Sequence, residues 1–539
     1  MNSSHLDQAF RRYVWYGAIG AALFLLLQVI PSAAGVGAES EPVHPVSRGQ
    51  AMAAAADFAQ KQLRALPQNA HAVHQADRLM AGYVAKEKLG KTLDSSAGLK
   101  VPVDVWQVTQ NFDDGRRLLV EIGMTSGKLV GWKQVLGPTG GDGGSSALEG
   151  EALDRTVQRQ ADELGLGQLR RSGPAKEGSV RYEAAITVGE ASLIVLAAGE
   201  RLEGENRLTR FQPVYEVPAS YAAYTMEQDR LGEQLSLLGN LLPSGIMTLL
   251  AIVYAIVMRR FTSFRRGWAL ALIFLAFYTV NNFNLLDGLR AIYGGEVNAE
   301  LAAMAQLVFM TALTFVMAVG AYFSLVAGDG LWRAQGRPLW TAGSEPGFGA
   351  EAWSAMKLSY ALAFLLLGLQ TLILGGLSAA TGAWATTDVT QSPYNMAALW
   401  LMPLLAWCAA IQEEAVYRLF GIGLLMKWIK NPFLASLIPT VIWALGHVTY
   451  PIYPSTTRLI ELTILGLLFS YLFLKFGFFT AVFTHAVMNS VLMSMSLFMT
   501  GRTAETAAGV IYIVAPIAVA WLMRRYGLQR RAAAYPPPA

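Results

Sequence analysis

The chain has 539 residues, and its 42 Lys and Arg against 38 Asp and Glu give a formal net charge of +4, a near-balance that argues against nucleic acid as a partner. Hydrophobic residues make up 53% of the chain and charged residues 15%, whereas a typical soluble domain is about 25% charged, so the composition excludes a disordered chain and argues against a wholly soluble one. The single cysteine, Cys408, excludes a disulfide framework and any zinc or iron–sulfur site built from several cysteines.

The first apolar stretch covers residues 13–34 and directly follows Arg11 and Arg12. It is long enough to span a bilayer, which takes about 20 residues. A cleaved signal peptide is the alternative interpretation, with a cleavage site at residues 32–34, but the apolar core of a signal peptide has only about 7–15 residues. We therefore interpret residues 1–35 as an N-terminal membrane anchor.

The polar segment that follows, residues 36–237, indicates a soluble α+β domain. Ala-rich stretches predict helices, and short alternating stretches separated by turns such as Asp113, Asp114 and Gly115 predict antiparallel strands. The predicted helices are 48–66 and 148–164, and the predicted strands are 103–112, 117–124, 128–136, 180–189, 191–198 and 209–217. A Gly-rich linker at 138–146 separates them into two similar units of one helix on a small sheet.

Two histidines of this domain, His71 and His74, lie three residues apart and would share one face of a helix. No third ligand accompanies them, so the sequence does not favour a metal site there. An envelope partner or an envelope signal is a candidate for what this domain binds, but no residue motif identifies either.

From residue 238 the chain is almost continuously apolar and predicts nine further membrane spans. Their approximate bounds are 238–258, 267–286, 301–327, 358–379, 394–416, 433–451, 459–474, 477–499 and 507–523. Cytoplasmic loops are enriched in Lys and Arg, and with both termini inside the cell the short outer loops hold only Arg290, Arg458 and Arg502. The predicted fold class is a mostly α, polytopic helical membrane protein of about ten spans, with an extracytoplasmic α+β domain inserted after the first span.

Glu413, Glu414 and Arg418 lie in an otherwise apolar stretch, where a charge at mid-bilayer costs about 2.5–3.5 kcal/mol or more. Glu414 and Arg418 are spaced i, i+4 and can neutralise each other on one helix face. Glu413 lies about 100° round the helix and lacks that partner, which suits a general base. The alternative is that both carboxylates lie at a helix end and reach the aqueous interface.

Three more polar residues lie in later spans. His447 falls in the predicted span 433–451, whereas His485 and Asn489, again spaced i, i+4, share one face of the span 477–499. A single membrane histidine is more often a packing residue that hydrogen-bonds between helices. Two histidines, an unpartnered carboxylate and an amide within one hundred residues favour a shared hydrated pocket instead.

These residues resemble the motifs of a known family. Glu413-Glu414-Ala-Val-Tyr-Arg418 is similar to the EExxxR motif of the CPBP (CAAX-protease and bacteriocin-processing, or Abi) intramembrane proteases. Trp443-Ala-Leu-Gly-His447 is similar to the family's FxxxH motif, with an aromatic-for-aromatic change that we expect to touch no chemical group. His485-Ala-Val-Met-Asn489 is similar to its third motif, HxxxN or HxxxD.

The resemblance implies a helical protease core at residues 391–525, with a cavity open to the cytosol. In it Glu413, aided by His447, would activate the attacking water, and His485 and Asn489 would stabilise the oxyanion. Glu414 and Arg418 would hold the helix and tune Glu413. The substrate would be a membrane-associated protein or peptide. Residues 238–390 would be helices of unknown role and 526–539 a cytoplasmic tail.

Glu413, His447 and His485 also form a two-His-one-carboxylate set of the kind that catalytic zinc uses, so the sequence leaves a metallo- and a glutamate-type protease open, with Zn²⁺ as the one candidate cofactor. A non-enzymatic immunity or scaffold protein with a structural polar core is the alternative function. A transporter with a proton relay is a third, but the sequence contains no inverted repeat to support it. The Ala, Gly and Arg bias favours a bacterial cell membrane.

Overall fold

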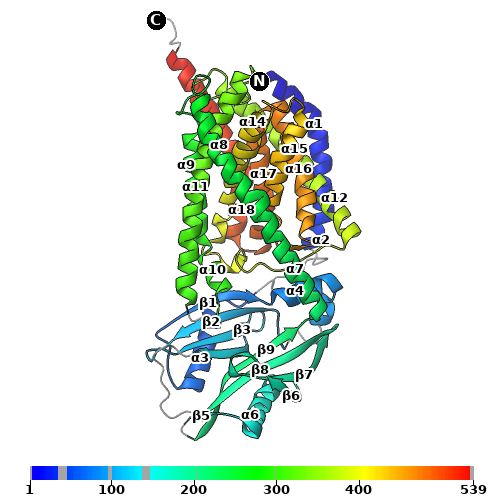
Figure 1. The fold of residues 1–539 in the computed structure, drawn as a ribbon, viewed down its shortest axis with the longest axis vertical. Helices are drawn as coiled ribbons and strands as arrows, with labels where there is room; N and C mark the ends of the chain where they lie inside the picture. The colour runs from blue at the N-terminus through cyan, green and yellow to red at the C-terminus, as the bar shows by residue number, and fades with distance from the viewer. Residues whose placement is uncertain are drawn as a thin grey trace.

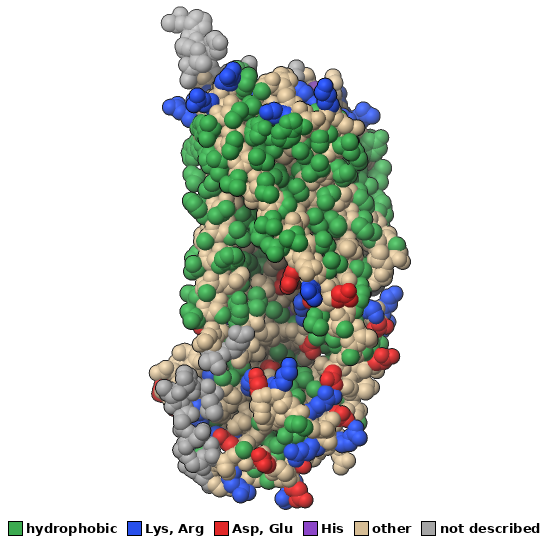
Figure 2. Space-filling view, viewed as in Figure 1, with side chains coloured by type: hydrophobic (Ala, Val, Ile, Leu, Met, Phe, Trp, Pro, Cys, Tyr) green, Lys and Arg blue, Asp and Glu red, His purple; other side chains and the backbone are tan. Residues whose placement is uncertain are grey.

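The computed structural model describes residues 3–33, 45–94, 100–135, 146–202, 204–295 and 298–534, except the side chains of residues 32–33 and 531–534. A long helical bundle carries a β-sheet domain at one end, and helix α1 begins at the opposite end of the bundle (Figure 1). On the face of the bundle that Figure 2 shows, hydrophobic side chains form a broad belt, and Lys and Arg gather at the end away from the sheet. The protein is therefore a polytopic helical membrane protein, as the sequence predicts.

The domain at the end of the bundle contains one antiparallel sheet. Its strands follow the order β1-β2-β3-β4-β9-β8-β7-β6, and β5 pairs with β8. The strands are β1 (Asn69–Ala76), β2 (Asp104–Asn111), β3 (Arg117–Gly123), β4 (Leu129–Val135), β5 (Ser146–Ala147), β6 (Leu169–Pro174), β7 (Val180–Val188), β8 (Ala191–Leu202) and β9 (Glu205–Glu216). The helices of the domain are α3 (Arg48–Leu63), α4 (Arg78–Glu87), α5 (Gly90–Thr92) and α6 (Gly150–Glu163), with a short turn η3 (Lys176–Gly178).

The sheet consists of two halves with a common order of elements. Helix α3 precedes β1–β4, helix α6 precedes β6–β9, and the last strands of the two halves pair at the centre of the sheet, with Trp132 opposite Phe211. All six predicted strands and both predicted helices are present, with bounds that differ by at most about four residues. The predicted linker at 138–146 lies almost entirely outside the described residues.

Helix α3 shows how local sequence sets these elements. Ser47 and Gln50 form a capping box in which each side chain accepts a hydrogen bond from the other residue's backbone N–H. Ala51, Ala55 and Ala59 then recur every four residues and are fully buried in the core shared with the sheet. Small side chains at this spacing let the helix backbone lie close to the strands.

One expectation for this domain is wrong. His71 and His74 lie on strand β1, which pairs with β2 over its whole length, and not on a helix face. Residues three apart on a strand point to opposite faces of the sheet. Strand pairing therefore separates two side chains whose i, i+3 spacing suggested that they would lie together.

The bundle contains eight described helices that are long and apolar enough to cross a membrane, or nine when the bent pair α9–α10 counts as one span. The shorter apolar helix α15 occupies the place of the remaining predicted span. The helical segments are α1 (Ser3–Phe24), η1 (Leu25–Val29), α2 (Ile30–Ala33), α7 (Ala219–Ser236), η4 (Leu237–Leu241), α8 (Leu242–Val257), α9 (Trp268–Asn284), α10 (Leu286–Ile292), α11 (Ala299–Ala334), α12 (Phe348–Thr381), η5 (Pro393–Asn395), η6 (Leu399–Leu401), α13 (Leu404–Glu413), η7 (Glu414–Ile422), α14 (Gly423–Leu425), α15 (Pro432–Leu445), α16 (Thr456–Phe476), α17 (Phe478–Met499) and α18 (Thr503–Ala534). A two-stranded sheet joins β10 (Trp384–Ala385) to β11 (Ile452–Tyr453).

Two helices differ in extent from the predicted spans. The helix that contains the predicted span 238–258 begins at Ala219, because α7 runs out of the sheet domain and continues through η4 into α8. Helix α15, which corresponds to the predicted span 433–451, ends at Leu445, so His447 lies in the turn that follows it. Apolar length marks only the part of a helix that lipid surrounds, whereas the helix itself continues or stops according to its polar contacts.

Small residues hold the first helix against the bundle. Gly20 of α1 and Gly368 of α12 approach so closely that a Cβ on Gly368 would lie 2.5 Å from the Cα of Gly20. Contacts of this kind are typical of small residues at helix interfaces in membranes. The packing of α1 against α12 supports its interpretation as an anchor.

Candidate active site

The candidate site begins at a change of helix type within the bundle. Glu413 is the last residue of α13, and Glu414 is the first residue of the π-helical segment η7, all nine residues of which are buried. π-helical turns inside α-helices are frequent at functional sites. The change of helix type places two consecutive carboxylates in different surroundings.

The helix that carries these carboxylates starts later than the predicted bound of residue 394. Ser392 caps only the single turn η5, and α13 begins after Pro403. The residues between are held by other elements, since Asn395 binds the backbone of His74 and Asn284 accepts a hydrogen bond from the backbone N–H of Ala398. Tertiary contacts therefore prevent a continuous helix here.

Glu414 and Arg418 form the predicted i, i+4 ion pair, with 3.2 Å between Oε1 and Nη1 and both side chains fully buried. The guanidinium of Arg418 also lies over the ring of Trp443, 4.4 Å from its centroid. The same Oε1 atom of Glu414 accepts a hydrogen bond of 2.8 Å from Nδ1 of His485. Glu414 thus links its own helix to α17.

Both histidines approach the carboxylate of Glu413. Its Oε1 atom lies 3.8 Å from Nε2 of His447, and its Oε2 atom lies 3.8 Å from Nε2 of His485. The indole N–H of Trp443 donates a hydrogen bond to Oε2. The side chains of Glu413, His447 and His485 are 15%, 19% and 5% exposed, so the cluster is inside the bundle without being sealed.

The partners of each histidine determine which ring nitrogen carries the proton. Nδ1 of His447 lies 3.0 Å from the carbonyl oxygen of Trp443, which can only accept, so Nδ1 is the donor. Nδ1 of His485 likewise donates to the carboxylate of Glu414. When either ring is neutral, its Nε2 atom keeps a lone pair on the side of Glu413, and a second proton there makes the ring a donor toward that carboxylate.

Asn489 lies one helical turn beyond His485 in α17. It is half-buried in a helix whose preceding turns are buried, and its amide makes no hydrogen bond to another side chain among the residues that the structure describes. The structure brings Glu413, His447 and His485 together with Glu414 and Arg418, whereas no hydrogen bond joins Asn489 to any of them.

Trp443 corrects an expectation. The sequence suggested that its ring, in place of a phenyl ring, would touch no chemical group, but its N–H donates to Glu413. A buried indole N–H needs an acceptor. That requirement is the sequence signal that could have indicated a polar partner for Trp443. Its partner lies 30 residues earlier in the chain.

The donor types of Glu413, His447 and His485 suit zinc, and each histidine donates its other N–H to an acceptor, as metal-binding histidines do. Their spacing does not fit, because among the described residues no group of three His, Cys, Asp or Glu side chains is placed as metal ligands are. We therefore derive no chemical step through a metal.

A cavity of about 140 Å³ lies where the loop after α15 meets α7. Val448, Thr449 and Tyr450 line one side of it, and the ring of Tyr450 lies 5.5 Å from that of His447. Tyr453 of the same loop donates to Asp229 of α7. The cavity is therefore on the side of the bundle that carries the sheet.

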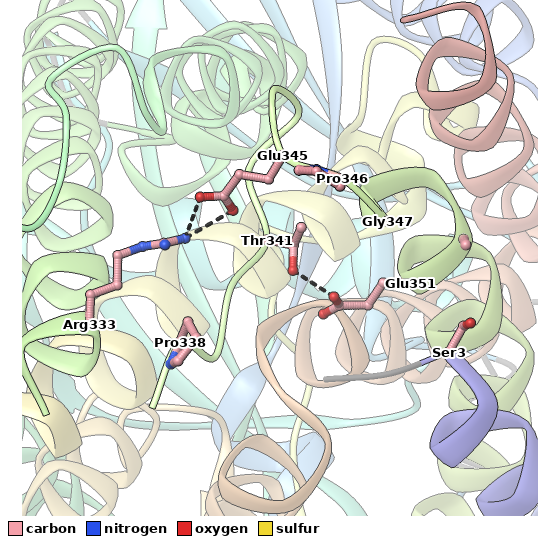
Figure 3. A pocket seen from close by; sticks show the side chains of 9 residues that line it. Ser3, Arg333, Pro338, Thr341, Glu345, Pro346, Gly347 and Glu351 are labelled. Carbon is pink, nitrogen blue, oxygen red and sulfur yellow. Dashed lines mark hydrogen bonds and ion pairs between the residues drawn. The ribbon is translucent and has the colours of Figure 1, made fainter. Parts of the chain in front are cut away.

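A second cavity, of about 390 Å³, lies at the other end of the bundle (Figure 3). Its charged side chains bind one another, because Arg333 pairs with Glu345 and the hydroxyl of Thr341 donates to Glu351. It lies beside the start of α1 and α12, away from the Glu413 cluster. These pairs hold the loop between α11 and α12 in place.

The other buried histidine cluster lies where the sheet meets the bundle. Nε2 of His74 donates to Asp104 at 2.9 Å, and the hydroxyl of Ser392 lies 2.7 Å from Nδ1. The Ser392 oxygen also accepts the backbone N–H of Tyr394. His74 and Ser392 are 0% and 3% exposed, so this serine–histidine–aspartate arrangement is inaccessible and joins the two domains.

The fold and the Glu413 cluster define a class: a polytopic membrane protein with a carboxylate–imidazole site inside its helices. Residues 395–491 match the family model described as type II CAAX prenyl endopeptidase Rce1-like. The resemblance of this region to the CPBP proteases is thereby confirmed. The matched region includes every residue of the cluster.

A curated relative is the sporulation-killing factor biosynthesis protein SkfC of Bacillus subtilis (strain 168), which is 32% identical over 89 residues. The match covers 16% of this chain and 18% of the relative, so the chain spans under a fifth of the relative's length. No solved structure matches the chain.

Proposed function

We propose that this protein is an intramembrane endopeptidase that hydrolyses a peptide bond of a membrane-associated protein or peptide. The observation that carries the proposal is the convergence of two Nε2 atoms, from separate helical segments, on the carboxylate of Glu413. A half-buried carboxylate next to imidazoles is what water activation requires. The match of residues 395–491 to an endopeptidase family supports the same reaction.

In the proposed reaction a water molecule between Glu413 and His447 attacks the carbonyl carbon of the scissile bond. Its proton passes to Glu413 and then to the amine nitrogen of the leaving product as the C–N bond breaks. His485, held by the carboxylate of Glu414, stabilises the oxyanion when its Nε2 is protonated. Asn489 is the second proposed donor, and its free amide is consistent with a partner that arrives with the substrate.

We further propose that both termini are cytoplasmic and that the sheet domain is extracytoplasmic. The Lys and Arg side chains at the end of the bundle away from the sheet support this orientation. The 140 Å³ cavity lined by Val448, Thr449 and Tyr450 then lies on the extracytoplasmic side of the bundle, whereas the family resemblance implies a cavity open to the cytosol. In this arrangement the sheet domain is placed to bind an envelope partner.

Cleavage by purified protein in liposomes tests the proposal. Glu413→Gln keeps the shape of the side chain and the acceptor for Trp443, and we expect it to reduce turnover of a quenched-fluorescence peptide library by about 10²- to 10⁴-fold. Glu351→Gln is the matched control, because it alters another buried carboxylate of the bundle that lies away from the cluster. Equal turnover by wild type and Glu413→Gln would show that the assignment is wrong.

The substrate can be sought in cells. Membrane and secreted proteins are compared between cells that contain wild-type protein and cells that contain Glu413→Gln, and the substrate is the one whose shortened form disappears. The similarity to a killing-factor biosynthesis protein supports a peptide precursor as one candidate. An immunity or scaffold function predicts instead that Glu413→Gln changes no cleavage product.

A further inference from the structure

Trp443 contacts two residues of the candidate site through polar atoms. It is 4% exposed, and its indole N–H donates to Oε2 of Glu413. Its carbonyl oxygen accepts the Nδ1–H of His447. A single residue thus holds both members of the proposed water-activating pair.

The ring itself packs against the remaining charged group of the site. The guanidinium of Arg418 lies over the Trp443 ring, and among the described residues none of its nitrogens has a well-formed hydrogen bond. The attraction between a guanidinium and an aromatic face is stronger when both groups are desolvated. Trp443 therefore lies between Arg418 and Glu413, with its face toward the cation and its N–H toward the carboxylate.

The hydrogen bond makes the two oxygens of Glu413 unequal. Oε2 accepts the indole N–H and faces His485, whereas Oε1 faces Nε2 of His447. An oxygen that already accepts a hydrogen bond is a poorer base than a free one. Oε1 is thus the oxygen placed to take a proton from a water that also touches His447.

We propose that Trp443 is a positioning residue that orients the Glu413 carboxylate through its indole N–H and so selects Oε1 as the base. The inference rests on the proposed function for its kinetic consequence, but the hydrogen bond itself does not. A phenyl ring at this position, as in the motif that residues 443–447 resemble, could stack on Arg418 but could not donate to Glu413.

The hydrogen bond is tested without any activity assay. Protein labelled with ¹⁵N in its indole groups gives one Nε1–H resonance per ordered tryptophan in detergent, and Trp443→Phe identifies the one that belongs to Trp443. We expect this resonance to move upfield by about 0.5 ppm or more in Glu413→Ala, because a charge-assisted hydrogen bond is lost. A Trp443 resonance that stays in place in Glu413→Ala would overturn the proposal.

Trp332 supplies the matched control, because it is a buried tryptophan of the same bundle whose N–H donates to the carbonyl oxygen of Leu419 at 2.8 Å. Its resonance, identified with Trp332→Phe, is expected to stay in place in Glu413→Ala. The control therefore separates the loss of one contact from a general change in the bundle.

Kinetics then test the positioning role. Trp443→Phe is expected to lower kcat about 10-fold with KM unchanged, whereas Trp332→Phe lowers the melting temperature and leaves both constants near wild type. Equal loss of kcat in the two variants would overturn the positioning role. Wild-type protein that cleaves nothing, together with the expected shift of the Trp443 resonance, would contradict the proposed function and leave the contact established.

Discussion

The junction between sheet and bundle and the interior of the bundle each contain a buried histidine beside a carboxylate, and the two regions use it differently. Both ring nitrogens of His74 have a partner, and its side chain has no exposed surface. His447 and His485 each bind one acceptor through Nδ1 and turn Nε2 toward Glu413. A histidine with one nitrogen held and the other facing a half-buried carboxylate is placed for proton transfer, whereas one with both nitrogens held fastens two elements together.

The junction shows why residue types alone are a poor guide to chemistry. A serine and an aspartate there each lie within hydrogen-bond distance of the same histidine, as in many hydrolases. The serine oxygen is already bound to a backbone N–H, and Asn395 pairs with the backbone of His74 as a neighbouring strand would. The arrangement leaves no room for a substrate, so it contributes to stability.

The largest effect is expected from exchanging the two kinds of histidine for alanine. His485→Ala should reduce cleavage by about 10²- to 10⁴-fold, because the proposed oxyanion donor is lost. His74→Ala should lower stability by about 1–3 kcal/mol, since it leaves buried polar partners unsatisfied, with turnover per folded molecule within about 2-fold of wild type. Turnover and detergent melting curves of both variants check this. Loss of turnover in folded His74→Ala would contradict a purely structural role for the histidine at the junction.

The next effect concerns the buried ion pair beside the site. Glu414→Gln should lower the free energy of unfolding by about 3–5 kcal/mol, because Arg418 becomes an uncompensated buried charge. Replacing both Glu414 and Arg418 by Met should recover much of that stability, but cleavage should stay low because His485 loses the acceptor that orients it. Denaturant titration and turnover of the single and double variants measure the two properties. Full activity in the double variant would show that Glu414 does not orient His485.

A smaller effect is expected in the sheet, where a carboxylate lies next to a neutral amide. Burial raises the pKa of Glu121, although the Gln212 amide that donates to it acts in the opposite direction. The folded state therefore binds this proton more tightly than the unfolded state, so stability falls as the pH rises through the folded-state pKa. Glu121→Gln should stabilise the protein by about 1 kcal/mol or less at pH 8 and by nothing at pH 4. The measurement is the melting temperature of wild type and Glu121→Gln at both pH values. The same difference between the two proteins at pH 8 and pH 4 would contradict a raised pKa for Glu121.

The smallest effect is expected from removing metal. The spacing of Glu413, His447 and His485 does not match a set of metal ligands, so turnover should be unchanged after dialysis against a strong chelator. Elemental analysis of the active sample is the control. Activity that disappears on chelation and returns with Zn²⁺ would show that the three side chains close around a metal during the reaction.

Much of the bundle could be predicted from the sequence, because apolar length and charge placement depend only on local composition. The same applies to the sheet domain, where alternation and turn residues such as Gly115, which has a φ of +78°, mark the strands. Strand β1 and the extension of α7 into the membrane could not be predicted. Strand β1 forms because it pairs with β2. Helix α7 is polar and continues directly into an apolar helix, so hydropathy detects no helix boundary between them.

By itself the sequence determined that the protein spans a membrane many times and that Glu413, Glu414, Arg418, His447, His485 and Asn489 form a family-like set of motifs. Only the tertiary structure decided which atoms of these residues meet: that Nε2 of each histidine faces Glu413, that His485 binds Glu414, and that Trp443 donates to the carboxylate. The physical reason is that hydropathy and helical spacing act within one segment, whereas these contacts join segments 30 or more residues apart. Their geometry depends on the local switch from α- to π-helix and on the packing of α15 and α17 around it.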